Sequence, residues 1–449
     1  MNKLMKILKI GLMMLSIVGT LSAENIKYKN VIIFGDSLSD TGNMPKSGSV
    51  SSGVEPPMNY ILPVTNPISF SFMGKEIALP KYAGESVKWS VPSKLYAEKY
   101  HQKNDKYSFN WVDYLLYNTY RHKDSQMLIN WVDYHSNSEL KINDSTSFNY
   151  SFVTAMSQNG YANPAYTLYK DDLTTDDIVK RIQNYKANPT QGNFDELAIP
   201  GVARQVELYI DDYNKDPVLQ NNEDTAYIIW IGGNDLSNAM QNKLVKGNLI
   251  SFYNDIGTMR KPGLIANNIS TAVKTLEKKV NAKHIYVANV FNIGKVPFLQ
   301  SYSSNPAVKF LLANIAGDLA KILNNQIKTI LLADSNVKVI NMAKYINTAM
   351  SSKQFNKATK AASKCVDTFM LFPQDVLSNN CYAIDHMTID TFWNGSHFAQ
   401  PMNQLIAYKF KTEVFDESFS LKDETESSDI DLMDDNFKNS VDKFNQQSS

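Results

Sequence analysis

The segment Gly35-Asp36-Ser37-Leu38 could present a serine nucleophile at a sharp turn. It directly follows the apolar run at residues 31–34, which predicts a buried parallel strand. Glycine allows a tight turn after a strand, and the serine then lies at the carboxyl edge of the sheet, where open α/β folds bind ligands. Ser37 is therefore a candidate nucleophile, with an ordinary turn between a strand and a helix as the alternative.

Two further positions could serve the same chemistry. Asn234 lies in a second glycine turn, Gly232-Gly233-Asn234-Asp235, and its amide could donate to an oxyanion, although the same residues also suit a plain turn. His397 lies at residues 392–404, a loop followed by a helix-like stretch. It is a candidate general base, because histidine exchanges protons near neutral pH.

The elements that would position these residues follow from the apolar pattern. Short apolar runs predict strands at residues 31–34, 225–236, 282–294 and 336–342. Apolar residues that recur every three or four positions predict helices at residues 201–214, 265–280 and 310–334. Strands that alternate with helices favour a parallel sheet covered on both faces, so we predict an α/β fold.

Taken together, the motifs resemble those of the GDSL or SGNH hydrolase family. Residues 34–43, FGDSLSDTGN, are similar to the first block of its lipase branch, GGND at 232–235 to the third block, and residues 282–297 to the strand and loop that follow. The loop between Cys365 and Cys381 precedes Phe392-Trp393 and His397. This arrangement resembles that of the secreted lipase and acyltransferase members of the family. The resemblance implies an SGNH-hydrolase-like three-layer α/β/α fold, with residues 24–415 as the hydrolase domain.

The resemblance also implies roles for individual residues. Ser37 would be the nucleophile, His397 the general base, and Asn234 an oxyanion donor beside the Ser37 N–H. The second block is similar to residues 148–157, where Val153 and Thr154 stand where the family usually has glycines. One of these two would supply a backbone N–H to the oxyanion, since any residue other than proline carries that donor.

The sequence leaves three alternatives for the acid of the triad. Asn394 occupies the position three residues before the histidine where the family has aspartate. In a serine protease triad, the corresponding Asp-to-Asn change lowers kcat about 10⁴-fold. Asp390 could supply the carboxylate from the same loop, Asn394 could accept the imidazole proton through its oxygen, or catalysis could have been lost.

The function that the resemblance implies is a secreted serine esterase. We expect hydrolysis of acyl esters of phospholipids or lysophospholipids through an acyl-Ser37 intermediate, with possible transfer of the acyl group to a sterol acceptor. The alternatives are a catalytically weak lipid- or glycan-binding protein and a carbohydrate O-acetyl esterase. The two cysteines and six histidines show no zinc-ligand spacing, so we expect no metal and no cofactor.

The first 23 residues predict export. Lysines precede a short apolar run at residues 10–18, and small residues end at Ala23, as in a cleaved signal peptide. Glycine, serine and threonine interrupt the run, which is too short for a membrane anchor. In an oxidising compartment we expect a disulfide between Cys365 and Cys381, worth about 3 kcal/mol in the chain-entropy model.

The charge balance gives no basis for binding nucleic acid, because the chain has 45 basic and 45 acidic residues.

Two regions of the chain do not fit the alternation of strands and helices. Residues 45–140, rich in Pro, Ser, Tyr and Lys, predict a large insertion after the first strand. The motif NWVDY occurs there twice, and we expect its Trp111 and Trp131 to pack on the core. The acidic residues 416–449 predict a disordered tail.

Overall fold

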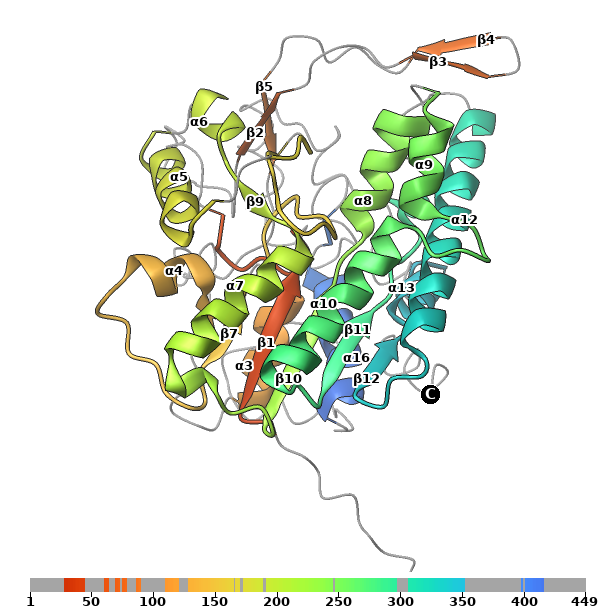
Figure 1. The fold of residues 1–449 in the computed structure, drawn as a ribbon. Coiled ribbons are helices and arrows are strands. Elements are labelled where there is room, and N and C mark those ends of the chain that lie inside the picture. Colours follow the sequence, from red (N-terminus) through yellow and green to blue (C-terminus); the bar gives the residue numbers. More distant parts are fainter. Residues whose placement is uncertain are drawn as a thin grey trace, which may run out of the picture.

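One six-stranded parallel sheet forms the centre of the protein (Figure 1). Its order is β12 (Val337–Ile340), β11 (Ile285–Ala288), β10 (Thr225–Trp230), β1 (Asn30–Gly35), β7 (Ser147–Asn149) and β6 (Leu128–Asn130). The computed structural model describes residues 28–44, 60–63, 69–72, 75–78, 86–89, 110–120, 128–164, 166–169, 173–188, 191–244, 247–296, 306–351, 397–398 and 400–415.

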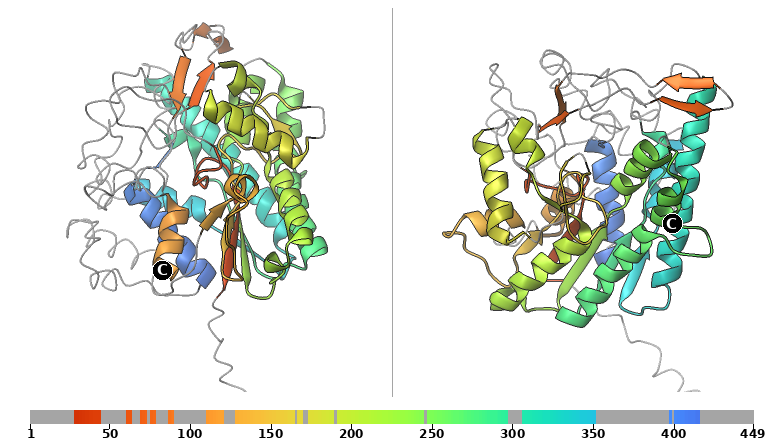
Figure 2. Two further views of the ribbon diagram at one scale, coloured as in Figure 1. Left: turned by 90° about the vertical axis from the view of Figure 1, so that its left-hand side faces the viewer. Right: turned by 45° about the horizontal axis from the view of Figure 1, so that its top comes forward.

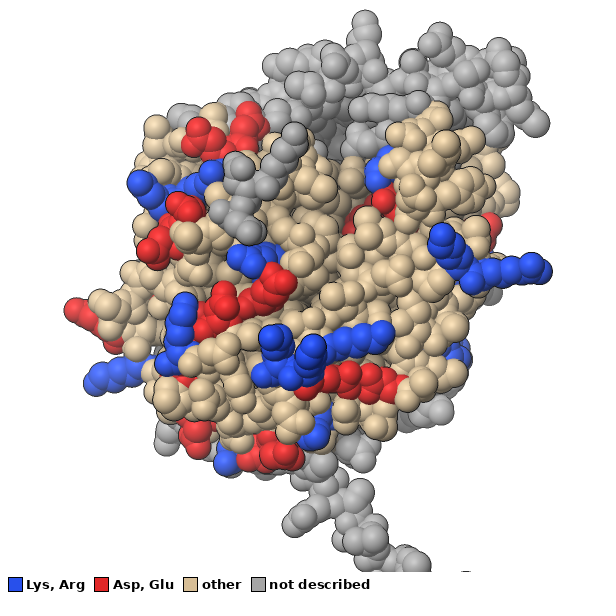
Figure 3. Space-filling view, viewed as in Figure 1, with Lys and Arg blue, Asp and Glu red and all other residues tan. Residues whose placement is uncertain are grey.

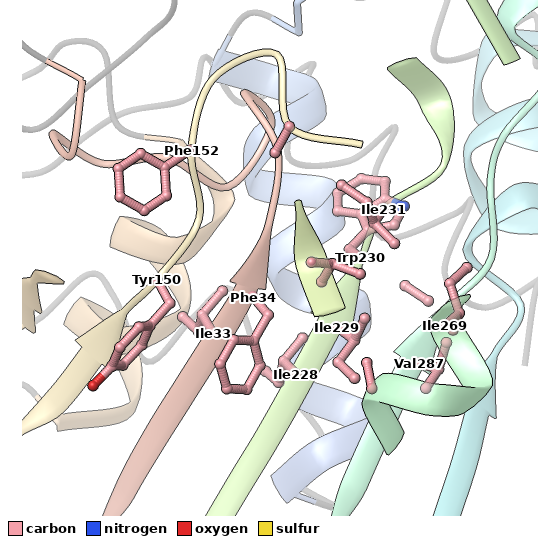
Figure 4. Packing of buried hydrophobic residues seen from close by; sticks show 14 of the residues in the cluster. Ile33, Phe34, Tyr150, Phe152, Ile228, Ile229, Trp230, Ile231, Ile269 and Val287 are labelled. Carbon is pink, nitrogen blue, oxygen red and sulfur yellow. The ribbon is translucent and has the colours of Figure 1, made fainter. Parts of the chain in front are cut away.

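The two central strands are buried along their whole length. Every residue of β1 and of β10 is buried, as expected for strands covered on both faces. Phe34 and Ile229 are paired in register, and their side chains pack among those of neighbouring strands (Figure 4). After β1 the chain continues to β6 and β7 on one side, whereas after β10 it continues to β11 on the other. Ligand sites in open α/β sheets lie where connections diverge in this way.

Helices cover both faces of the sheet (Figure 2). On one face, α7 (Val202–Lys215) packs against α10 (Leu264–Val280), which also contacts α12 (Pro306–Leu331). On the opposite face, α3 (Trp111–Tyr120) packs against α16 (Gln400–Phe415), which contacts α13 (Met342–Ser351). The sequence therefore predicted the α/β class and its parallel sheet correctly, together with the helices near residues 201–214, 265–280 and 310–334.

The other elements are short and lie mainly in the connections. The helical segments are α4 (Trp131–Ser136), α5 (Thr175–Ala187), α6 (Gln191–Asp195), η1 (Pro217–Leu219), α8 (Gly233–Asn238), the π-helical η2 (Ala239–Leu244), α9 (Leu249–Ile256) and η3 (Ile293–Lys295). Three two-stranded sheets pair β2 (Tyr60–Pro63) with β5 (Ser86–Trp89), β3 (Ser69–Phe72) with β4 (Lys75–Ala78), and β8 (Tyr161–Ala162) with β9 (Ile199–Pro200).

The predicted insertion at residues 45–140 needs correction at its C-terminal end. Strand β6 lies within that range and is the edge strand of the main sheet, and α3 covers one face of it. Three residues are too few to show a strand period, which is why the sequence pattern missed β6. The expectation that Trp111 and Trp131 pack on the core is confirmed, since both side chains are fully buried.

Charged side chains of both signs are mixed on one face of the protein (Figure 3). On the face seen in Figure 3, Lys and Arg side chains alternate with Asp and Glu side chains, so no single-sign patch forms over α7 and α10. Among the described residues, none of the helices is both long enough and apolar enough to cross a bilayer.

An aromatic cluster joins α3 and α16 to the sheet. The Trp111 ring stacks on Phe410 with centroids 4.1 Å apart, and both rings meet Trp230 edge-on at 5.9 Å. Trp230 is the last residue of β10 and is paired with Gly35 of β1. The cluster therefore fixes α16 against the end of the sheet that is next to Ser37.

We expect Trp111→Ala to lower the free energy of unfolding by about 3–5 kcal/mol, because it leaves a large cavity between two helices. Urea denaturation followed by circular dichroism measures this loss. Phe310→Ala is the control, because this α12 ring is 72% exposed, and it should change stability by less than about 0.5 kcal/mol. Equal effects of the two variants would contradict the role of the cluster.

Candidate active site

Ser37 and His397, which are 360 positions apart in the chain, meet at the carboxyl edge of the sheet. The Ser37 Oγ and His397 Nε2 atoms are 2.8 Å apart, and both side chains are buried. A hydroxyl within hydrogen-bond distance of an imidazole nitrogen has the geometry of a nucleophile and its base. The structure thus brings together the two residues that the sequence selected for these roles.

The turn that carries Ser37 is held from three sides. A Cβ at Gly35 would lie 2.7 Å from the Trp230 carbonyl oxygen, so only glycine fits between β1 and β10 at this point. The buried Gln205 of α7 accepts from Gly35 N and donates to Gly35 O, both at 2.9 Å. Beyond the glycine, Asp36 Oδ1 accepts from Leu38 N, which closes a tight turn around the serine.

His397 is positioned by the start of α16. The next residue, Phe398, is buried and its ring lies 5.0 Å from that of Phe291, which follows β11. The buried Asn403 donates from Nδ2 to the Phe398 carbonyl oxygen at 2.9 Å. Both contacts fix the backbone next to the imidazole.

Asn234 lies in the first turn of α8, which begins directly after the Gly232 turn at the end of β10. Gly232 has a φ of 115°, and a Cβ there would lie 2.9 Å from Val290, so this turn requires glycine. The Asn234 Nδ2 donates to the Ala155 carbonyl oxygen at 2.9 Å, and its Oδ1 accepts from the Tyr166 hydroxyl at 3.3 Å. One of the two Nδ2 hydrogens remains available for another acceptor.

The structure distinguishes between Val153 and Thr154, the two alternative backbone donors that the sequence offered for the oxyanion. Val153 N donates to Asp40 Oδ2 at 3.0 Å and is therefore already engaged. Within the described part of the chain, neither Thr154 N–H nor Ser37 N–H has a protein acceptor. Thr154 has a φ of 61°, the left-handed region that favours glycine, which accounts for the family's usual glycine at this block. Thr154 is thus the candidate with a free N–H.

Asp40 ties the serine turn to the loop that contains Thr154. Its Oδ1 accepts from Gly42 N and Asn43 N, both at 2.8 Å, and its Oδ2 accepts from Met44 N and Val153 N. Burial raises the pKa of Asp40 to about 7, in opposition to these four donors, which favour the ionised form.

An asparagine network continues this connection. Asn43 donates to the carbonyl oxygens of Asn149 and Ser151, and Asn149 in turn donates to Ser39 O and Thr41 Oγ1. The polar residues after the serine in the first block therefore serve to hold the second block in place.

The electrostatic environment favours a neutral imidazole. Burial lowers the pKa of His397 to about 3, so the ring is unprotonated at neutral pH and can accept the Ser37 proton. Burial also raises the pKa of Asp36 to about 7 and raises that of Asp235, whose carboxylate accepts from Ser157 N and Oγ. The described residues include no cluster of three or more ligand side chains that could hold a metal ion.

Four residues named by the sequence lie outside the described residues: Asp390, Asn394, Cys365 and Cys381. The identity of the acid and the disulfide therefore stay predictions, as do the signal peptide and the acidic tail.

The structure also shows contacts of Gln205, Tyr166 and Asp40 that the sequence did not predict. Only Asp40 had a signal, because it lies within the quoted first block; the other two are on segments without a motif.

Comparisons with known proteins show a match to one protein family. The family profile described as GDSL-like Lipase/Acylhydrolase matches residues 31–410. A search of curated proteins found no match. Among solved structures, a putative GDSL-like lipase from Parabacteroides merdae is 10% identical, with a TM-score of 0.33 over 87% of this chain and 97% of that one. The acetylxylan esterase Axe2 from Geobacillus stearothermophilus is 10% identical, with a TM-score of 0.32 over 88% and 97%.

We expect Asp40→Ala to lower the free energy of unfolding by about 2–4 kcal/mol, because it removes the acceptor of four backbone N–H groups. Urea denaturation measures the change. The matched control is Asp318→Ala on α12, an exposed acid paired with Lys321, for which the change should stay within about 0.5 kcal/mol. A stability of Asp40→Ala equal to that of the control would show that the buried carboxylate does not hold the two loops.

Proposed function

The chain belongs to the GDSL-like lipase/acylhydrolase family, and on this premise we propose that it hydrolyses acyl esters through an acyl-Ser37 intermediate. The observation that carries the proposal is the 2.8 Å contact between Ser37 Oγ and His397 Nε2, both buried at the carboxyl edge of the sheet. Among the described residues, the Ser37 and Thr154 N–H groups have no acceptor, and such backbone donors, together with an asparagine amide, are what acyl transfer needs to stabilise an oxyanion.

The reaction proceeds in two halves. Ser37 Oγ attacks the acyl carbon while His397 Nε2 takes its proton, and the imidazolium then protonates the alcohol oxygen as the ester bond breaks. Water attacks the acyl-serine, gives its proton to His397, and the carboxylic acid leaves as the Ser37 oxygen regains that proton. In both halves the charge on the carbonyl oxygen is stabilised by three donors: the N–H groups of Ser37 and Thr154 and the Nδ2 of Asn234.

The substrates that we propose are phospholipids and lysophospholipids in an exported setting. The support is the resemblance to secreted lipases and the predicted signal peptide in the first 23 residues. Transfer of the acyl group to a sterol uses the same intermediate, since an alcohol then replaces water as the attacking group. A carbohydrate O-acetyl esterase uses the same residues and differs in its substrate alone.

Ser37→Ala tests the nucleophile. We expect it to lower kcat/KM for p-nitrophenyl butyrate and lysophosphatidylcholine at least ~10³-fold, because no acyl-enzyme can form. Ser39→Ala is the matched control, since the Ser39 hydroxyl is buried without a partner among the described residues, and it should keep most of the activity. Unchanged hydrolysis by Ser37→Ala would overturn the assignment. Faster turnover of acetylated xylan than of lysophosphatidylcholine would favour the carbohydrate esterase.

The triad acid is tested by Asp390→Asn and Asn394→Asp, which exchange a carboxylate and an amide of almost equal size. If Asp390 supplies the carboxylate, Asp390→Asn should lower kcat by up to about 10⁴-fold and Asn394→Asp should change it little. A large gain in kcat from Asn394→Asp would instead show that the wild-type triad lacks its acid. Lipid binding without a burst of product in single-turnover assays would identify a binding protein.

A further inference from the structure

Two residues with a backbone conformation that is costly for them flank Asn234. Three non-glycine residues of the described chain have positive φ: Thr154 (61°), Tyr166 (64°) and Asn281 (53°). Asn281 ends α10 as its C-cap, where asparagine commonly adopts this conformation. Thr154 immediately precedes Ala155, the acceptor of the Asn234 amide, and Tyr166 donates to that same amide.

The conformation of Tyr166 is imposed by its loop. Asn163 N donates to Thr167 O at 2.8 Å, Asn163 Oδ1 accepts from Thr167 N, and Tyr166 N donates to Asn163 O. These bonds close a loop of five residues after β8. The left-handed region is unfavourable for a tyrosine, because its Cβ approaches the following carbonyl oxygen. Strain of this kind persists where surrounding contacts hold it, and it is concentrated at functional sites.

The orientation of the Asn234 amide is unambiguous. The Ala155 carbonyl oxygen can only accept, so the Asn234 atom 2.9 Å from it is Nδ2. Oδ1 therefore faces the Tyr166 hydroxyl, which must donate. Burial, with Asp36 and Asp235 nearby, raises the pKa of Tyr166 well above its usual value, so the hydroxyl keeps its proton throughout the working range of pH.

We propose that Tyr166 is a positioning residue of the oxyanion hole: its hydroxyl fixes Oδ1 of Asn234 and thereby directs the second Nδ2–H toward the oxyanion. A donor on the amide oxygen also polarises the amide, which makes its N–H a stronger donor, as in cooperative hydrogen-bond chains. Both effects act on the charge that develops in the transition state and little on the bound ester. The inference rests on the proposed ester hydrolysis and extends it to a residue outside the family motifs.

The test is the kinetics of Tyr166→Phe with p-nitrophenyl acetate and p-nitrophenyl butyrate. We expect kcat to fall about 3- to 10-fold, the range for one lost hydrogen bond, with KM within about twofold of the wild type. In an Asn234→Ala background the same substitution should cause no further fall, because the group on which the hydroxyl acts is gone. A general structural role would lower kcat in both backgrounds.

Tyr169→Phe is the matched control. This tyrosine is three residues further along the chain, but its hydroxyl donates to Asp195 O and not to Asn234, so kcat should not change. Phenylboronic acid gives a readout besides turnover, since its tetrahedral adduct with a serine places an oxygen in the oxyanion hole. Its affinity should fall in Tyr166→Phe by the same factor as kcat, and stay unchanged in Tyr169→Phe.

The outcomes distinguish failure of the proposed ester hydrolysis from failure of the positioning role of Tyr166. Loss of hydrolysis in Ser37→Ala supports the ester hydrolase whatever Tyr166 does, and unchanged hydrolysis in that variant removes the proposed function. Wild-type kcat in Tyr166→Phe, an equal fall in the Asn234→Ala background, or an effect on KM alone would overturn the positioning role. If the wild type shows no turnover, unchanged phenylboronic acid affinity in Tyr166→Phe would overturn it, and reduced affinity would support it.

Discussion

The buried carboxylate of Asp40 is the constraint on which the rest of the site depends. Three of its donors belong to the turn after Ser37, and the fourth, Val153 N, belongs to the loop after β7. A buried acceptor that satisfies four backbone N–H groups can be removed only at the cost of leaving them unpaired. These hydrogen bonds therefore fix the turn after Ser37 and the loop that contains Thr154 relative to each other.

This coupling lets a polar site be built at the edge of an apolar core. The strands β1 and β10 are buried along their length, and polar groups collect only where these strands end. Buried polar side chains there bind specific partners: Gln205 binds the backbone of Gly35, Asn43 binds that of the loop after β7, and Ser157 binds Asp235. Such hydrogen-bond networks rigidify a site, which is what electrostatic stabilisation of an oxyanion requires.

Apolar packing, rather than a hydrogen-bond network, positions His397. Phe398 enters the core beside Phe291, and α16 is fixed by the stacking of Phe410 on Trp111. Trp111 comes from a segment that the sequence assigned to an insertion, yet it contacts the last residue of β10 next to the site. The packing that positions the imidazole also buries it, and this burial lowers its pKa and keeps the ring neutral.

Much of the architecture was readable from local pattern. Buried parallel strands leave continuous apolar runs, so β1, β10, β11 and β12 were predicted, whereas the three-residue strands β6 and β7 carry too little periodic signal. Ser37, Asn234 and His397 were found because glycine turns and motif spacing mark them. Gln205 lies on an ordinary amphipathic helix, and Tyr166 in a loop without a motif, so nothing local distinguishes either residue.

By itself, then, the sequence determined the α/β class, the family resemblance and the choice of Ser37, Asn234 and His397 as candidate site residues, because short segments carry these signals. The tertiary structure alone decided how those residues are held. It showed that Val153 N donates to Asp40, that Thr154 N has no acceptor among the described residues, and that Tyr166 and Ala155 fix the Asn234 amide. The physical reason is that hydrogen bonds between residues tens to hundreds of positions apart depend on how loops meet in space, which no local pattern encodes.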